Sequence, residues 1–178
     1  AVGGRDGALF TANRRTLPPS QADAVSRMLM RPLRAKRIDE LLVERRTFAE
    51  RDFLAMQLDT RAEGYDLIRD TLLSVVPKDE HEPKLMRARN LAEAWNGTAD
   101  VDQTAFRLLQ AYSRTLLAPG LTPLLAPATE ADPSFVYRWP LADEVVRRLL
   151  DERPANLLTS EHADWPSFLR QTLLETID

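Results

Sequence analysis

Hydrophobic residues recur at helical spacing along most of the chain, in stripes that proline and glycine separate. Residues 33–76 and 84–118 contain no proline, and both stretches are typical of helix. Apolar residues three or four positions apart predict helices that each bury one face. The predicted stripes are Ile38, Leu41 and Leu42; Phe53, Leu54 and Leu58; Tyr65, Ile68, Leu72 and Val75 or Val76; Leu85, Ala88, Ala92 and Trp95; and Val101, Ala105, Leu108, Tyr112 and Leu116.

Polar and special residues mark where these helices begin and end. Thr47 followed by Glu50 has the spacing of a capping box, which predicts a helix start at that point. Pro77 ends the third stripe because proline lacks an N–H donor. Gly97 can adopt the left-handed conformation that closes the fourth stripe. Two more helices are predicted near the C-terminus, one with Leu141, Val145 and Leu149, and one that begins near Asp164-Trp165-Pro166 with Phe168, Leu169, Leu173 and Ile177.

Two segments depart from this helical pattern. Five prolines fall between residues 118 and 140, and they predict an ordered Pro-rich loop at 118–140, too apolar for a solvated tether. Residues 1–16 carry three glycines and an extended stretch for which the chain offers no partner strand. We therefore predict an all-α fold: a helical middle domain at 17–178, preceded by an extended segment at 1–16 that belongs to the core of a larger protein.

Composition removes several classes of site. The 178 residues include no cysteine, which excludes disulfides, thiolate zinc sites and cysteine nucleophiles. No apolar run reaches the roughly 18 residues of a membrane span. No glycine-rich loop lies between a strand and a helix, as a phosphate-binding loop requires. His81 and His162 are isolated in polar stretches, and we interpret both as surface residues.

Charge is unevenly distributed along the chain. Residues 1–37 contain eight Lys or Arg and two acids, which gives +6, whereas residues 38–178 carry −9. A basic segment on an acidic body is typical of proteins that bind nucleic acid, an anionic ligand or an acidic partner. Phe10 is the one aromatic residue in the basic segment, so it lacks the stacking residues of a nucleic-acid surface. We expect no nucleic-acid partner.

Four short motifs occur in an order that resembles the penicillin acylase (penicillin amidase) family. Leu9-Phe10-Thr11-Ala12-Asn13-Arg14-Arg15 resembles the family's Thr-Ala-Asn-Asn-Arg-Pro segment, and Arg34-Ala-Lys-Arg37-Ile38-Asp39-Glu40-Leu41-Leu42 its Arg-x-x-Arg-Ile-x-x-Leu-Leu helix. Thr47 to Asp52, leading to Gln57-Leu-Asp59, is similar to its Thr-x-x-Asp-x-x-x-x-Gln-x-Asp stretch. Trp95-Asn96-Gly97 lies where the family usually has Trp-Asp-Gly. Arg14, Thr16 and Asn96 depart from the usual pattern.

The resemblance implies an N-terminal nucleophile hydrolase, which is a periplasmic or secreted enzyme cut from a precursor into α and β chains. The serine that begins the β chain serves as both nucleophile and base in amide hydrolysis. Our motifs match the middle of the β chain, so we expect the remaining partners to be the α chain and the β-chain core. The implied substrate is a small N-acyl amide, such as an acylated β-lactam or an acyl-homoserine lactone. The chain alone is expected to be inactive.

The resemblance also assigns three residues. Asn13 matches the asparagine whose amide helps to hold the oxyanion, and Arg34 matches an arginine that orients the surroundings of the nucleophile. Asp23 lies eleven positions before Arg34, the spacing of a calcium-ligand aspartate in the family. No other cofactor is expected. The residues alone leave alternatives open: Asn13 in an ordinary turn, Arg34 as one more cation of a basic helix, and Asp23 as an acid at a helix N-terminus.

A different class of function also fits the pattern. A non-enzymatic helical interaction domain could use the basic segment to bind an acidic partner. The sequence upstream distinguishes the two hypotheses, because a Ser, Cys or Thr at an autocleavage site supports the amidase.

Overall fold

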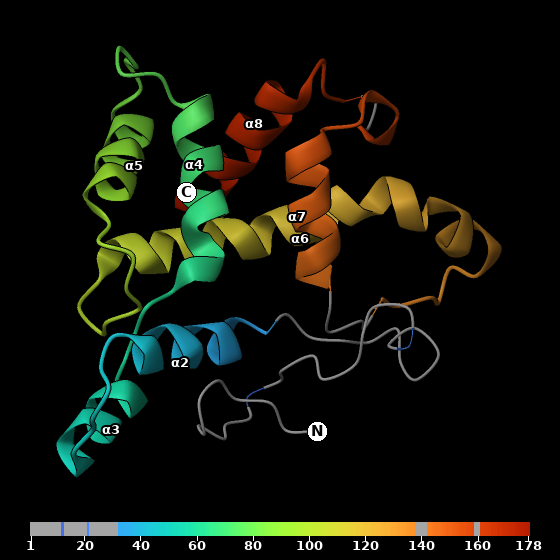
Figure 1. The fold of residues 1–178 in the computed structure, drawn as a ribbon. Coiled ribbons are helices and arrows are strands. Elements are labelled where there is room, and N and C mark those ends of the chain that lie inside the picture. Colours follow the sequence, from blue (N-terminus) through green and yellow to red (C-terminus); the bar gives the residue numbers. More distant parts are fainter. Residues whose placement is uncertain (1–11, 13–20, 22–31, 138–141, 159–160) are drawn as a thin grey trace. The chain divides into compact units, whose positions relative to one another are not determined.

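Every regular element in the described part of the chain is a helix (Figure 1). The computed structural model describes residues 12, 21, 32–137, 142–158 and 161–178. Its helices are α2 (Leu33–Val43), α3 (Glu50–Gln57), α4 (Asp66–Val75), α5 (Pro83–Ala94), α6 (Thr104–Ala131), α7 (Ala142–Glu152) and α8 (Trp165–Ile177), with 3-10 turns at Glu63–Tyr65 and Ala155–Leu157. The all-α prediction is confirmed for these residues.

The chain divides into two compact units, Ala1–Thr60 and Arg61–Asp178. No local signal predicts a division at residue 60, because residues 33–76 contain no proline and have one glycine, Gly64. The predicted boundary at residue 16 falls outside the described residues. Each unit is described separately below.

In the second unit, α6 packs against α4, α5, α7 and α8, and α4 also packs against α5 and α8. Tyr112 of α6 is fully buried and donates a hydrogen bond of 2.9 Å from its hydroxyl to the carbonyl oxygen of Leu169 in α8. The predicted stripes of α4 and α5 form much of this core. The side chains with the least exposure are Leu72, Val76, Leu85, Leu109, Tyr112, Leu116, Leu169 and Leu173.

Local signals placed two helix ends correctly. α4 ends at Val75, two residues before Pro77. α8 begins at Trp165, and the carboxylate of Asp164 accepts a hydrogen bond of 2.8 Å from the backbone N–H of Ser167, which caps the helix. Pro166 lies in the first turn, where a missing N–H costs nothing.

The predicted Pro-rich loop is wrong for residues 118–131, because α6 continues to Ala131 with three prolines inside it. Pro119, Pro123 and Pro127 are spaced four residues apart, so their rings lie along one side of the helix. Burial of apolar side chains in the same helix favours the helix: Leu116 and Leu121 are in the core, and Leu125 packs against it. Burial of this apolar face offsets the local cost of proline, which sequence patterns overestimate when tertiary packing is unknown.

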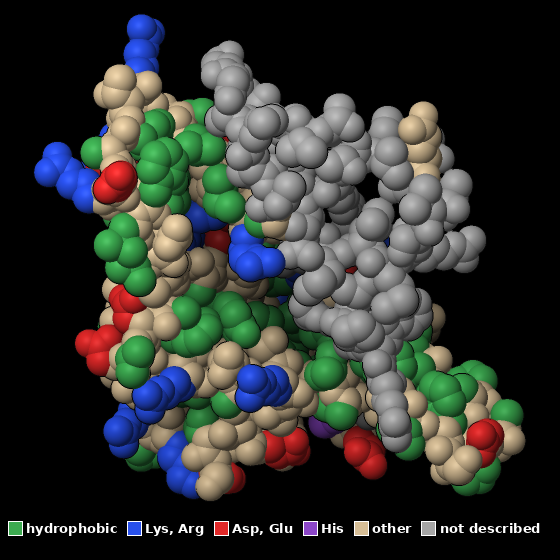
Figure 2. Space-filling model, turned by 90° about the horizontal axis from the view of Figure 1, so that it is seen from below, with side chains coloured by type: hydrophobic (Ala, Val, Ile, Leu, Met, Phe, Trp, Pro, Cys, Tyr) green, Lys and Arg blue, Asp and Glu red, His purple; other side chains and the backbone are tan. Residues whose placement is uncertain are grey.

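Five of the described residues that were predicted to be buried are exposed. Phe53, Leu54 and Leu58 were expected to point inward, yet they are 46%, 55% and 68% exposed, and α3 has no buried residue. Periodicity predicts which side of a helix is apolar, but not whether another element covers that side. Val101 precedes α6 and is exposed, and in α7 the core residue is Val146 instead of Val145. Figure 2 shows hydrophobic side chains exposed among Lys and Arg on the face drawn there.

Candidate functional site

A polar bridge in the first unit joins α2 to the chain segment that follows α3. Arg37 Nε donates to Asp59 Oδ1 at 3.1 Å, and Arg37 Nη2 donates to Asp59 Oδ2 at 2.7 Å, so both carboxylate oxygens are engaged. The remaining guanidinium nitrogen, Nη1, donates to Glu40 Oε2 at 3.3 Å. The Arg37 and Asp59 side chains are only 31% and 20% exposed. The hydrogen bond to Asp59 is the largest cause that raises the pKa of Arg37 above its ordinary value.

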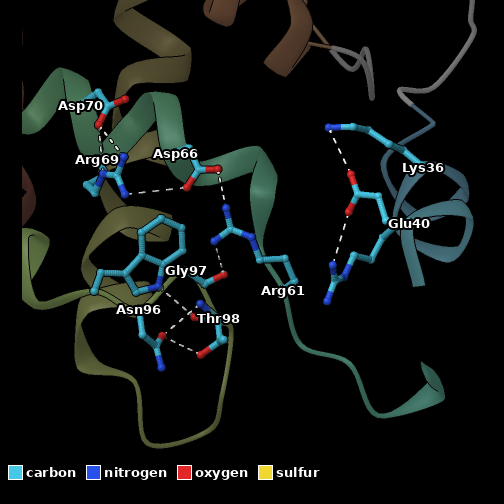
Figure 3. A network of polar contacts seen from close by, with 11 residues as sticks. Lys36, Glu40, Arg61, Asp66, Arg69, Asp70, Asn96, Gly97 and Thr98 are labelled. Carbon is cyan, nitrogen blue, oxygen red and sulfur yellow. Dashed lines mark hydrogen bonds and ion pairs between the residues drawn. The ribbon is translucent and has the colours of Figure 1, made fainter. Parts of the chain in front are cut away.

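Glu40 is shared between two cations of α2. Its Oε1 lies 3.5 Å from Lys36 Nζ, one turn earlier in the helix (Figure 3). Lys36 is more than half exposed, so this pair contributes little to stability, whereas the bidentate Arg37–Asp59 pair is partly shielded from water.

The start of α3 lies two residues later than predicted. The helix begins at Glu50 with Ala49 at the N-cap, so Thr47 is not its capping residue. Asp52 at the third helical position accepts a hydrogen bond of 2.8 Å from the backbone N–H of Ala49. This backbone hydrogen bond is the largest cause that lowers the pKa of Asp52. Thr47-Glu50 has the right spacing, but the carboxylate that reaches back is two residues further along.

Arg34 lies in the first turn of α2, three positions before Arg37, and its side chain is exposed. Residues three apart lie on the same side of a helix, so the side chains of Arg34 and Arg37 are neighbours on α2. The described structure therefore places a cation on the surface of α2, next to the residue that ties this helix to Asp59.

In the second unit, the turn after α5 is built around Trp95 and Gly97. Trp95 is buried, and its Nε1 donates to the Thr98 carbonyl oxygen at 2.8 Å. Asn96 Oδ1 accepts hydrogen bonds from the backbone N–H of Thr98 at 3.0 Å and from its hydroxyl at 2.7 Å (Figure 3). Gly97 has a φ of +86°, as predicted for a residue in the left-handed region.

Arg61 holds this turn from the start of the second unit. Its Nη1 donates to the Gly97 carbonyl oxygen at 3.0 Å and its Nη2 to Asp66 Oδ2 at 2.8 Å (Figure 3). A Cβ at position 97 would lie 1.6 Å from Arg61 Nη1. The positive φ is what favours glycine at this position, and a side chain there would also push the end of the Arg61 side chain away from the turn.

The sequence was compared with known families and proteins. A family model described as penicillin amidase matches residues 2–178. The chain belongs to the penicillin amidase family. No match was found among curated proteins or among solved structures. Membership of the penicillin amidase family supports an amidohydrolase as the protein to which the chain contributes.

Of the three site residues expected for a penicillin amidase, only Arg34 lies in the described part of the chain. Asn13 and Asp23 lie outside the described residues, so the oxyanion and calcium assignments stay predictions. Arg34 is described, but only as an exposed residue of α2. In the described part of the chain, no group of three or more His, Cys, Asp or Glu could hold a metal ion, and no helix is long and apolar enough to cross a membrane.

The contact between two of the penicillin amidase motifs was not predicted from their residues. Arg37 belongs to the Arg-x-x-Arg-Ile helix and Asp59 to the Gln-x-Asp stretch, and they are 22 positions apart. Both residues are visible in the motifs, but whether they form an ion pair over this separation depends on the path of the chain through α3. The only signal in the sequence was that the two motifs carry residues of opposite charge.

Proposed function

We propose that the protein containing this chain hydrolyses linear N-acyl amides to a carboxylic acid and an amine. The family match over residues 2–178 is the observation that supports this proposal most strongly. Acylated β-lactams and acyl-homoserine lactones are the substrate classes that we propose. We also propose a periplasmic or secreted location, and association with an α chain and with the β-chain core; family membership supports both proposals.

The proposed reaction has two steps. A serine at the start of the β chain attacks the amide carbonyl, and its own α-amino group takes the proton, which yields a tetrahedral oxyanion. As this intermediate collapses, the α-ammonium group returns the proton to the departing nitrogen, which releases the amine and leaves an acyl-enzyme. Water, deprotonated by the same α-amino group, then hydrolyses the ester to the carboxylic acid and restores the serine. The chain described here is expected to be inactive by itself, because it does not supply that nucleophile.

Asn13 is proposed to stabilise the oxyanion through its side-chain amide. A neutral donor suits this role because it can meet the developing negative charge without altering the protonation of the amine base. Arg34 is proposed to orient the surroundings of the nucleophile. Asp23 is proposed as a ligand of a structural calcium ion, a hard cation for which a carboxylate oxygen is suitable.

Substitution of Asn13 in the full-length protein tests the proposal. Asn13→Ala should lower kcat by about 10²–10³, or roughly 3–4 kcal/mol, with a much smaller change in KM, because the lost hydrogen bond forms mainly in the transition state. Asn13→Asp should be at least as harmful, since it adds a negative charge beside the developing one.

The assay uses chromogenic phenylacetyl and longer-chain acyl amides with protein that is verified as cleaved and folded, so that a maturation defect is not mistaken for lost chemistry. Arg15→Ala is the matched control, because our proposal gives this nearby residue no catalytic role. A near-normal kcat for Asn13→Ala would show that the oxyanion assignment is wrong.

A further inference from the structure

We propose that Arg37 and Asp59 are positioning residues that hold α2 in the orientation that Arg34 needs for catalysis. This inference rests on the proposed function, because it assumes that Arg34 acts near the nucleophile. The Arg37–Asp59 bridge connects the helix that carries Arg34 to the segment after α3. It therefore links two motifs of the penicillin amidase family that the sequence alone leaves separate.

The bridge matters because the apolar packing of α2 is incomplete: its larger apolar side chains Leu33, Ile38, Leu41 and Leu42 are only half-buried. Ala35 is the single buried residue of α2, and its methyl group offers little contact area. α3 contains no buried residue at all. The N-cap residue Pro32 provides no side-chain hydrogen bond to the first turn of α2. The bidentate ion pair is a specific, partly shielded contact between α2 and the segment after α3.

The geometry of this contact fixes direction as well as distance. Arg37 uses Nε and Nη2 for Asp59 and Nη1 for Glu40, so each of its three guanidinium nitrogens has a carboxylate partner. Two parallel hydrogen bonds to one carboxylate resist rotation of the guanidinium plane, which a single point contact from lysine would not.

Arg34 is close enough along the helix to follow any movement at Arg37. Three residues correspond to about 4.5 Å along the axis, less than one turn. A catalytic group that is displaced by about 1 Å can lose roughly 10²-fold in rate. Loss of the bridge should therefore reduce kcat through Arg34 and leave the binding of substrate nearly unchanged.

A kinetic double-mutant cycle in the full-length, processed protein tests this coupling with a chromogenic phenylacetyl or acyl amide. Arg37→Lys and Asp59→Asn should each lower kcat by about tenfold or more, with KM changed by less than about twofold. In an Arg34→Ala background the same substitutions should cause no further loss, because the group they position is gone. Lys36→Ala is the control: this neighbouring cation also pairs with Glu40, but it is exposed and should keep normal kcat.

A second measurement needs no substrate. Because this chain has no cysteine, spin labels can be placed through cysteines at Asp39 in α2 and Ala55 in α3, with any cysteine elsewhere in the full-length protein replaced. The distance distribution between the labels should be narrow in the parent and wider with Arg37→Lys, but unchanged with Lys36→Ala. An unchanged width in the Arg37→Lys protein would overturn the proposal, whether or not a substrate is known.

The two experiments distinguish failure of the positioning proposal from failure of the proposed function. If Arg34→Ala lowers kcat while Arg37→Lys and Asp59→Asn are neutral, the positioning proposal fails and the proposed function stands. Losses that add fully in the Arg34→Ala background would also overturn it, because they would show a stabilising role unrelated to Arg34. If Asn13→Ala and Arg34→Ala both leave amide hydrolysis unchanged, the proposed catalytic roles fail first.

Discussion

Arg89 should be one of the most sensitive stability positions in the second unit, because it supplies a donor that the backbone lacks. In a continuous helix the carbonyl oxygen of Leu73 would accept a hydrogen bond from residue 77, but residue 77 is proline and has no N–H. Arg89 Nη1 donates to that oxygen at 3.1 Å and also to the carbonyl oxygen of Val76. A buried cation thus caps the C-terminus of α4, where the helix dipole is negative.

The expected cost of removing this cap follows from those contacts. Each hydrogen bond from a charged donor is worth about 1.5–3 kcal/mol. Arg89→Met loses the two to the backbone carbonyls, and also the one to the half-exposed Glu93, which contributes little. The net loss of stability is smaller than this total, because the folded state no longer has to bury a charge and because water that reaches the carbonyls can hydrogen-bond to them. We therefore expect Arg89→Met to lower the free energy of unfolding by about 2–4 kcal/mol. Arg89→Lys should lose roughly half as much, because one ammonium cannot reproduce the planar fork.

Urea unfolding followed by far-UV circular dichroism measures this difference, with the m-value as a check that the transition is unaltered. Glu93→Gln is the matched control. Glu93 accepts from Arg89 Nη2 at 2.6 Å, but it is nearly half exposed, so its neutralisation should cost less than about 1 kcal/mol. A cost below about 1 kcal/mol for Arg89→Met would refute the argument that these carbonyls depend on Arg89.

Two further outcomes are expected in the same assay. Pro123→Ala should raise the free energy of unfolding by about 1–3 kcal/mol, because it restores an N–H donor to the interior of α6; a destabilised variant would contradict a helix at this position. Hydrogen bonding by Arg170 is the main cause that lowers the pKa of Glu80 from its ordinary 4.5 to about 2. The folded-state pKa is the lower one, so this stabilisation is present above pH 4.5 and is lost as the pH falls toward 2. The difference in unfolding free energy between the parent and Glu80→Gln should therefore shrink between pH 7 and pH 3, and a constant difference would show that Glu80 is not held ionised by these contacts.

The elements that the sequence predicted best are those specified by local signals and by a continuous core. In α4 and α5 the apolar stripe is the buried stripe, and Pro77 and Asp164 mark helix ends through their own backbone chemistry. α6 was predicted too short because the cost of proline is local and visible, whereas the burial that offsets it is tertiary. For α3 the reverse holds: the stripe is visible, but no described residue buries it.

The candidate site could be predicted only in part for similar reasons. Motif resemblance identified Asn13, Arg34 and Asp23 as candidates. Such a resemblance assigns a role to each residue but does not say where the side chains lie relative to one another. The Arg37–Asp59 bridge required the chain path through α3 to be known, since 22 residues separate its partners. The Gly97 turn could be predicted from the sequence, because a positive φ after a helix depends on the identity of a single residue.

The proposed mechanism depends on a nucleophile that is generated by cleavage of a precursor. Intact-mass measurement of the full-length protein, combined with active-site titration on a chromogenic acyl amide, tests this directly. We predict two chains, with serine at the N-terminus of the β chain that contains the segment described here, and a burst of about one equivalent of amine per β chain when the acyl-enzyme accumulates. A single uncleaved chain that releases no amine from phenylacetyl or longer-chain acyl amides would contradict the proposal that this penicillin amidase family member is an N-terminal nucleophile hydrolase.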